Sequence, residues 1–212
     1  CKGEAVQLTA TGGNQYEWSD GQISETALFS PLVSSTYHVI VRTADNCTGS
    51  KTIRIEVKEL PEPIIFGNPA ITSGNLYLCQ GDTATLTADG GTDYLWSTGE
   101  TGNMIRITRQ GRYTVTATDE HGCSGKTSVI VNMKNAPIPH IDGELSFCEG
   151  NSTELRASGG SAYQWNTNAT TPAITVSQSG QYTVTVSNTE GCTVSATALV
   201  TVIPKPVFTV TG

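Results

Sequence analysis

The hexapeptide Tyr94-Leu95-Trp96-Ser97-Thr98-Gly99 has two close relatives elsewhere in the chain, at residues 16–21 and 163–168. Each of the three contains one of the three tryptophans of the 212-residue sequence, and each tryptophan lies 17 residues after a cysteine. The tryptophans are Trp18, Trp96 and Trp165. A motif that returns with a fixed spacing to a second marker indicates an internal repeat. The chain therefore consists of three copies of one unit.

Cysteines and a second set of tyrosines mark the same three units. The cysteines are Cys1, Cys47, Cys79, Cys123, Cys148 and Cys192, and pairing them in chain order gives separations of 46, 44 and 44 residues. Each later cysteine follows a tyrosine by ten residues, and these tyrosines are Tyr37, Tyr113 and Tyr182. Six cysteines allow 15 pairings. We expect the pairing that makes the units equivalent, with one disulfide in each: Cys1–Cys47, Cys79–Cys123 and Cys148–Cys192.

Apolar residues alternate with polar ones in short runs, as in Ala84-Thr85-Leu86-Thr87-Ala88. This period of two predicts strands with one buried and one solvated face, which is typical of an antiparallel sandwich. On this pattern the tryptophans and the three tyrosines above point the same way as the aliphatic residues. We therefore predict an all-β protein of three tandem sandwich modules, with Trp18, Trp96, Trp165, Tyr37, Tyr113 and Tyr182 as structural core.

Three Pro-x-Pro segments separate the units, at residues 61–63, 137–139 and 204–206. Proline fixes φ and removes a backbone donor, so these segments are stiff linkers and not central strands. A short apolar stretch follows each linker and is expected to form the first strand of the next module. The predicted modules span residues 1–60 (without a first strand), 61–136 and 137–205, and residues 206–212 are the first strand of a fourth.

The two ends of the chain are expected to be complementary. Module one would expose a strand edge, which is a template for another strand. Residues 207–211 alternate as a strand does, so we expect this tail to dock on module one of another molecule by strand addition. The alternative is a tail that is disordered or merely extends past module three.

A tryptophan on the third strand and a tyrosine opening the penultimate strand resemble the core of immunoglobulin-like domains. The second cysteine departs from that family, because Val39, Val115 and Val184 stand two residues after the tyrosine. Together with Y-x-W-S-x-G, the pattern resembles the Ig-like and PKD-like repeats of large cell-surface or secreted proteins of Bacteroidota, adhesins among them. The resemblance implies an immunoglobulin-like fold, tandem neighbours of the same kind and a place outside the cell.

Composition excludes several classes of function. The net charge of −7 and the scattered basic residues argue against nucleic-acid binding. No run of 18 apolar residues suggests a membrane span. No histidine occupies the same place in two units, so we expect no catalytic site and no cofactor.

Calcium stays open, because acidic or amide side chains precede each second cysteine, although turn-forming residues explain the same letters. Disulfides require an oxidising compartment, for a bacterium the periplasm.

Two functions remain. The first is a non-catalytic extracellular segment that acts as a stalk or adhesive spacer of a large cell-surface protein, with an unknown glycan or protein as its ligand. The alternative is an array of accessory, carbohydrate-binding modules of a secreted polysaccharide-degrading enzyme. Three apolar residues on the outward faces break the polar pattern and would be of interest for ligand binding, although single exposed apolar residues are ordinary and need no partner: Ile40, Leu95 and Leu199.

Overall fold

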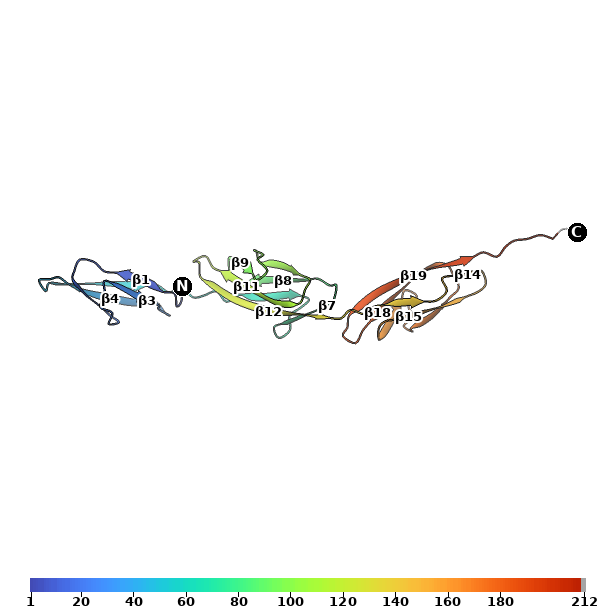
Figure 1. Cartoon of the computed structure of the whole chain (residues 1–212), viewed down its shortest axis with the longest axis horizontal. Coiled ribbons are helices and arrows are strands. Elements are labelled where there is room, and N and C mark those ends of the chain that lie inside the picture. Colours follow the sequence, from blue (N-terminus) through green and yellow to red (C-terminus); the bar gives the residue numbers. More distant parts are fainter. Residues whose placement is uncertain (211–212) are drawn as a thin grey trace. The chain divides into compact units, whose positions relative to one another are not determined.

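A computed structural model describes residues 1–210, and within them all regular structure is β-strand (Figure 1). The strands form six sheets, which fall into three pairs along the sequence. Residues 6–55 hold a two-stranded sheet, β1-β3, and a three-stranded sheet, β2-β4-β5. These strands are β1 (Val6–Thr9), β2 (Gln15–Trp18), β3 (Thr26–Phe29), β4 (Ser35–Arg42) and β5 (Thr48–Ile55).

The second pair of sheets lies within residues 64–134 and has two more strands. Its sheets have the orders β10-β8-β6 and β7-β12-β11-β9. The additional strands are β6 and β7, which precede the counterpart of β1. The bounds are β6 (Ile64–Asn68), β7 (Asn75–Cys79), β8 (Ala84–Asp89), β9 (Asp93–Trp96), β10 (Met104–Ile107), β11 (Gly111–Thr118) and β12 (Ser124–Lys134).

The third pair of sheets, within residues 140–203, repeats the second. Its orders are β13-β15-β17 and β14-β19-β18-β16. All pairings in it are antiparallel except that of β14 with β19, which is parallel. The bounds are β13 (His140–Asp142), β14 (Ser146–Cys148), β15 (Thr153–Ser158), β16 (Ala162–Trp165), β17 (Ala173–Val176), β18 (Gly180–Ser187) and β19 (Thr193–Ile203).

The buried side chains are those that the alternation places inward. Leu86, Val115 and Val184 are fully buried, and the three tryptophans are 4%, 2% and 1% exposed in chain order. Each indole Nε1 donates to a backbone carbonyl, of Ser24, Gly102 or Thr171. Tyr37, Tyr113 and Tyr182 are half-buried. The chain is thus an all-β array of immunoglobulin-like sandwiches.

The Gly-Gly pair before each Tyr-x-Trp motif has a packing reason. A Cβ on Gly91 would lie 2.8 Å from the Cβ of Ala117 and 3.1 Å from the carbonyl oxygen of Thr118. Gly13 and Gly160 face the equivalent residues of their own sheets at still closer range. The hydroxyl of the following tyrosine, such as Tyr94, donates to the carbonyl of the same glycine. The second glycine therefore lets the chain pass close over the penultimate strand.

By Cα proximity the chain forms two compact units. One comprises residues 1–74, 85–107 and 111–130, and the other residues 75–84, 108–110 and 131–212. The division into modules 1–60, 61–136 and 137–205 stays a prediction about which segments fold alone. We keep the name module for these three ranges.

The predicted strand in the tail is not formed in the single chain. Residues 206–210 have no regular structure, and Val207, Phe208 and Val210 are 98%, 80% and 89% exposed. Thr211 and Gly212 lie outside the described residues. The reason is that a strand needs a neighbour to bond its backbone, and this segment has none within residues 1–210.

Replacing Trp96 with alanine is expected to lower the free energy of unfolding by about 3–5 kcal/mol, because it removes a large buried aromatic side chain. Leu95→Ala is the matched control, since Leu95 lies on the same strand with its side chain 53% exposed. Urea unfolding followed by circular dichroism measures both. Equal, small losses for the two variants would show that Trp96 is not part of the core.

Candidate functional site

The parallel pair β14–β19 fixes where the two cysteines of module three lie (Figure 1). Cys148 pairs with Ile203, at the far end of β19, whereas Cys192 directly precedes Thr193, at its start. Eleven residues of extended chain separate Cys192 from Ile203, which corresponds to roughly 35 Å. Because a disulfide needs Cα atoms within about 7 Å, Cys148 cannot reach Cys192.

Modules one and two have the same arrangement. The amide after the first cysteine donates to a carbonyl that lies eleven residues beyond the second cysteine. These bonds are Lys2 N to Lys58 O, Gln80 N to Lys134 O and Glu149 N to Ile203 O, at 2.9, 2.9 and 2.8 Å. In every module the first cysteine therefore lies at one end of the last strand and the second cysteine at the other end.

The disulfides join consecutive modules. Cys1 is bonded to Cys123, with Cα atoms 5.4 Å apart, and Cys79 is bonded to Cys192, with Cα atoms 5.6 Å apart. The expected bridges Cys1–Cys47, Cys79–Cys123 and Cys148–Cys192, one within each module, are therefore wrong. Sequence spacing could not reveal this, because joining the first cysteine of each module to the second cysteine of the next also treats the modules alike.

Two cysteines stay as thiols in the single chain. Cys47 and Cys148 are both free and exposed, whereas Cys123 and Cys192 are 0% exposed. Cys47 is a second cysteine whose counterparts bond to the module before, and Cys148 is a first cysteine whose counterparts bond to the module after. The exposure of a cysteine here reflects whether a neighbouring module covers it.

A tight turn presents each second cysteine. Asp119 Oδ1 accepts hydrogen bonds from the amides of His121 and Cys123, at 2.9 and 2.8 Å, and Asn188 Oδ1 bonds Glu190 and Cys192 in the same way. These are the side chains that left calcium open in the sequence, and here they serve the turn. Within residues 1–210 no three His, Cys, Asp or Glu side chains gather as potential metal ligands.

The segment between modules two and three is bonded to the turn that carries Cys192. Asn188 Nδ2 donates to the carbonyl of Asn135, and the Asn135 amide donates to Glu190 Oε2. Lys134 Nζ donates to the carbonyl of Glu190. At the preceding linker a Cβ on Gly125 would collide with the carbonyl of Pro61. Close contacts thus accompany both bridges. Beside Cys1–Cys123, the strand β12 contacts the linker at Pro61, and beside Cys79–Cys192 the turn that carries Cys192 contacts residues 134 and 135.

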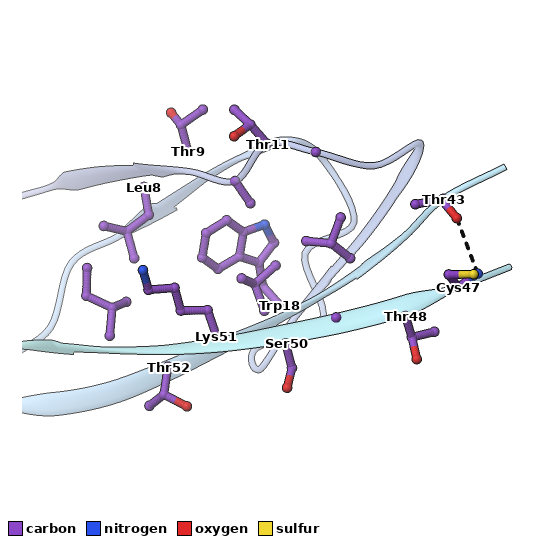
Figure 2. Close-up of a pocket in the computed structure, with 16 residues that line it drawn as sticks. Leu8, Thr9, Thr11, Trp18, Thr43, Cys47, Thr48, Ser50, Lys51 and Thr52 are labelled. Carbon is purple, nitrogen blue, oxygen red and sulfur yellow. Dashed lines mark hydrogen bonds between the residues drawn. The ribbon is translucent and has the colours of Figure 1, made fainter. Parts of the chain in front are cut away.

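Module one contains a cleft of about 750 Å³ between its two sheets (Figure 2). Leu8 on β1 and Ile53 on β5 line it, Trp18 lies at its base, and Cys47 stands at one end, where its amide donates to Thr43 Oγ1. The counterparts of β1 and β5 in the other modules each pair with one more strand, β6 and β7 or β13 and β14. The cleft therefore lies where modules two and three place their first two strands.

The outward apolar residues differ in exposure. Leu95 and Leu199 are 53% and 67% exposed, whereas Ile40 is half-buried and lines a hollow of about 400 Å³ on module one. The tryptophans, which could have served as a platform for a sugar ring, are buried. Within residues 1–210 no helix is long and apolar enough to cross a membrane.

Neither a protein-family model nor a curated protein matches this chain. Among solved structures it is similar to a three-immunoglobulin fragment of titin, at 15% identity and a TM-score of 0.39, over 97% of this chain and 94% of that one. It is also similar to a 1.5-MDa bacterial ice-binding adhesin, at 13% identity and a TM-score of 0.31, over 96% and 92% of the two chains. The insect immune protein hemolin matches at 15% identity and a TM-score of 0.33, over 95% and 72%. No functional statement follows at these levels.

Peptide mapping without reduction is expected to find Cys1 linked to Cys123 and Cys79 linked to Cys192. Alkylation of the folded protein with N-ethylmaleimide should label Cys47 and Cys148 alone, because both are exposed thiols. A peptide that joins Cys148 to Cys192 would contradict the register of β14 on β19.

Proposed function

We propose that the chain is a non-catalytic extracellular repeat segment that acts as a stalk or adhesive spacer of a cell-surface protein. The observation that carries the proposal is that both disulfides join consecutive modules. A bridge within a module would stabilise that module only. A bridge between modules holds the array together when one module opens, which is what a spacer under tension needs.

The bridges shorten the covalent path along which tension is transmitted. From Cys1 the path runs through the first bridge to Cys123, back along the chain to Cys79 and through the second bridge to Cys192. It contains the 44 residues between Cys79 and Cys123, so unfolding can separate Cys1 and Cys192 by roughly 160 Å at most. Without bridges the limit is roughly 650 Å. The bridges therefore limit how far the array can lengthen when its modules unfold.

The proposed location follows from the same bonds. Disulfides with sequence separations of 122 and 113 residues form and persist in an oxidising compartment, which supports a location outside the cell, and the oxidation step proposed for a bacterium is periplasmic. Its nearest partners are modules of its own kind. A protein at the exposed Leu95 or Leu199 faces is the further partner that an adhesive role requires.

The alternative, an accessory carbohydrate-binding array, calls for exposed aromatic side chains that stack on sugar rings. Tyr77 on β7 is 51% exposed, but Lys134 Nζ stands over its ring at 5.6 Å from the centroid. Phe66 is 56% exposed and stands alone on β6. The two ring pairs found within residues 1–210, Trp18 with Phe29 and Phe29 with Tyr37, belong to the core of module one.

In affinity electrophoresis we expect no retardation by polysaccharides cast in the gel, since the three tryptophans are buried. Leu95→Ala should migrate as the unchanged protein does. Retardation by one polysaccharide would favour the accessory function over the stalk.

Single-molecule pulling tests the stalk directly. With handles beside Cys1 and Cys192, the oxidised protein is expected to reach a fully unfolded length of roughly 160 Å and the reduced protein roughly 650 Å. Cys123→Ser removes the first bridge, so the shortest path becomes the 78 residues from Cys1 to Cys79 and the limit rises to roughly 270 Å.

Cys47→Ser is the matched control, because Cys47 belongs to neither bridge and the limit should stay unchanged. If the oxidised protein lengthens as far as the reduced one, the bridges do not limit extension and the proposed role fails. The proposed role would also fail if Cys47→Ser raised the unfolded length and Cys123→Ser left it unchanged.

A further inference from the structure

We propose that Cys148 of one molecule and Cys47 of a second copy form a third bridge of the same kind, which joins copies of this chain head to tail. In this joint the tail of the first copy lies in the cleft of module one of the second copy. The inference goes beyond a spacer role, because it assigns a covalent assembly site to module one and another to module three, and it needs no binding ligand.

The first argument is that Cys148 has the local structure of the two first cysteines that are bridged. In each case the carbonyl of the cysteine accepts the amide three residues later, which closes a turn: Glu4 N to Cys1 O, Asp82 N to Cys79 O and Asn151 N to Cys148 O. Cys1 and Cys79 use this turn to reach the next module. Cys148 presents the same turn with a free thiol.

Cys47 likewise stands in the turn of the second cysteines. The amide of Thr43 donates a hydrogen bond to the carbonyl of Cys47 at 3.0 Å. The amides of Asp119 and Asn188 donate in the same way to the carbonyls of Cys123 and Cys192, at 2.9 and 3.0 Å. The residue before the cysteine has positive φ in all three turns, with 59° at Asn46, 82° at Gly122 and 83° at Gly191. The two free thiols are therefore the two halves of the bridge that the chain already makes twice.

The cleft and the tail support the same joint. In module two, β6 follows the Pro-x-Pro linker and pairs Ile65 with Ala88 on β8; in module three, Ile141 pairs with Ala157. Ile65 and Ile141 are each two residues after the linker's last proline, the place that Phe208 holds after Pro206. Counted from the last proline of the linker, Phe208 of the first copy is therefore the residue that would pair with Ala10 at the cleft of the second copy.

The sequence therefore supplies both the apolar cleft and the apolar strand that fits it. Leu8, Trp18 and Ile53 line the cleft, and Phe208 is 80% exposed in the single chain. Burying a phenylalanine side chain contributes favourably by removing apolar surface from water. Backbone pairing with β1 would satisfy the donors and acceptors of its outer edge.

The bond forms by thiol–disulfide exchange with a disulfide oxidant such as oxidised glutathione. The thiolate of Cys148 attacks the oxidant and releases one glutathione thiolate, which takes up a proton. The thiolate of Cys47 then displaces the second glutathione and closes the Cys148–Cys47 bond. Two cysteine thiols lose two protons and two electrons, and one glutathione disulfide becomes two thiols.

Two single variants test the direction of the joint. Cys47→Ser keeps only the Cys148 thiol and Cys148→Ser keeps only the Cys47 thiol, and neither change touches an existing bridge. In a glutathione redox buffer each variant alone should stay monomeric. An equal mixture should give a dimer on non-reducing electrophoresis, with a peptide that links Cys148 to Cys47. The unchanged protein should form a ladder of oligomers that dithiothreitol collapses.

Homodimers of either variant that form as readily as the mixed dimer would overturn the proposal, because exposed thiols would then be oxidising without a matched surface. A mixture that stays monomeric would overturn it too. Both results leave the spacer role standing, since pulling measures the bridges within one chain.

The linker after module three is two residues shorter than the linker after module two, because Pro204 directly follows Ile203 whereas two residues separate Lys134 from Pro137. The docking of the tail is therefore tested separately from the thiols. Phe208→Asp should slow formation of the mixed dimer at least several-fold, because a carboxylate would enter the apolar cleft. Val207→Asp is the control, since its counterpart Ile64 is 58% exposed. Equal rates for both variants would show that the tail does not occupy the cleft.

Discussion

The parallel pairing of β14 with β19 is the constraint on which the covalent organisation of this chain depends. It places Cys148 level with Ile203, so the two cysteines of one module lie at opposite ends of its last strand. A module with this register cannot close a disulfide on itself, and each cysteine is instead offered to the module before or after. In the chain-entropy model a bridge that closes a loop of more than 100 residues stabilises by about 5 kcal/mol. Small sandwiches thus share stability with their neighbours.

The sequence predicts the sandwiches well because their signals are local. Alternation places Leu86 and Val184 inward, and the fixed position of Trp96 relative to Cys79 identifies the repeat. The spacing of the cysteines identifies them as the covalent framework but does not identify their partners. Pairing depends on the register of two strands that are far apart in sequence and run parallel, and no local pattern reports that register. Spacing alone is equally compatible with bridges within modules and between them.

Burial on the last strand shows the same limit. Ile53 on β5 is 45% exposed, whereas its counterparts Val129 on β12 and Ala198 on β19 are 2% and 8% exposed. All three are apolar and stand six residues after the second cysteine. They differ because β12 and β19 pair with β7 and β14, and β5 has no such neighbour among the described residues. The cleft of module one therefore follows from sheet neighbours, which alternation cannot reveal.

The central claim, that the two cysteines of one module lie at opposite ends of it, is open to direct measurement. In the variant Cys47→Ser/Cys79→Ser the bridge Cys1–Cys123 stays intact, and Cys148 and Cys192 become the two free thiols. Nitroxide labels on them allow the distance to be measured by pulsed electron paramagnetic resonance. The register predicts a distribution centred at roughly 35 Å, from eleven residues of extended strand. A distance below about 15 Å would place both cysteines at one end and contradict the account.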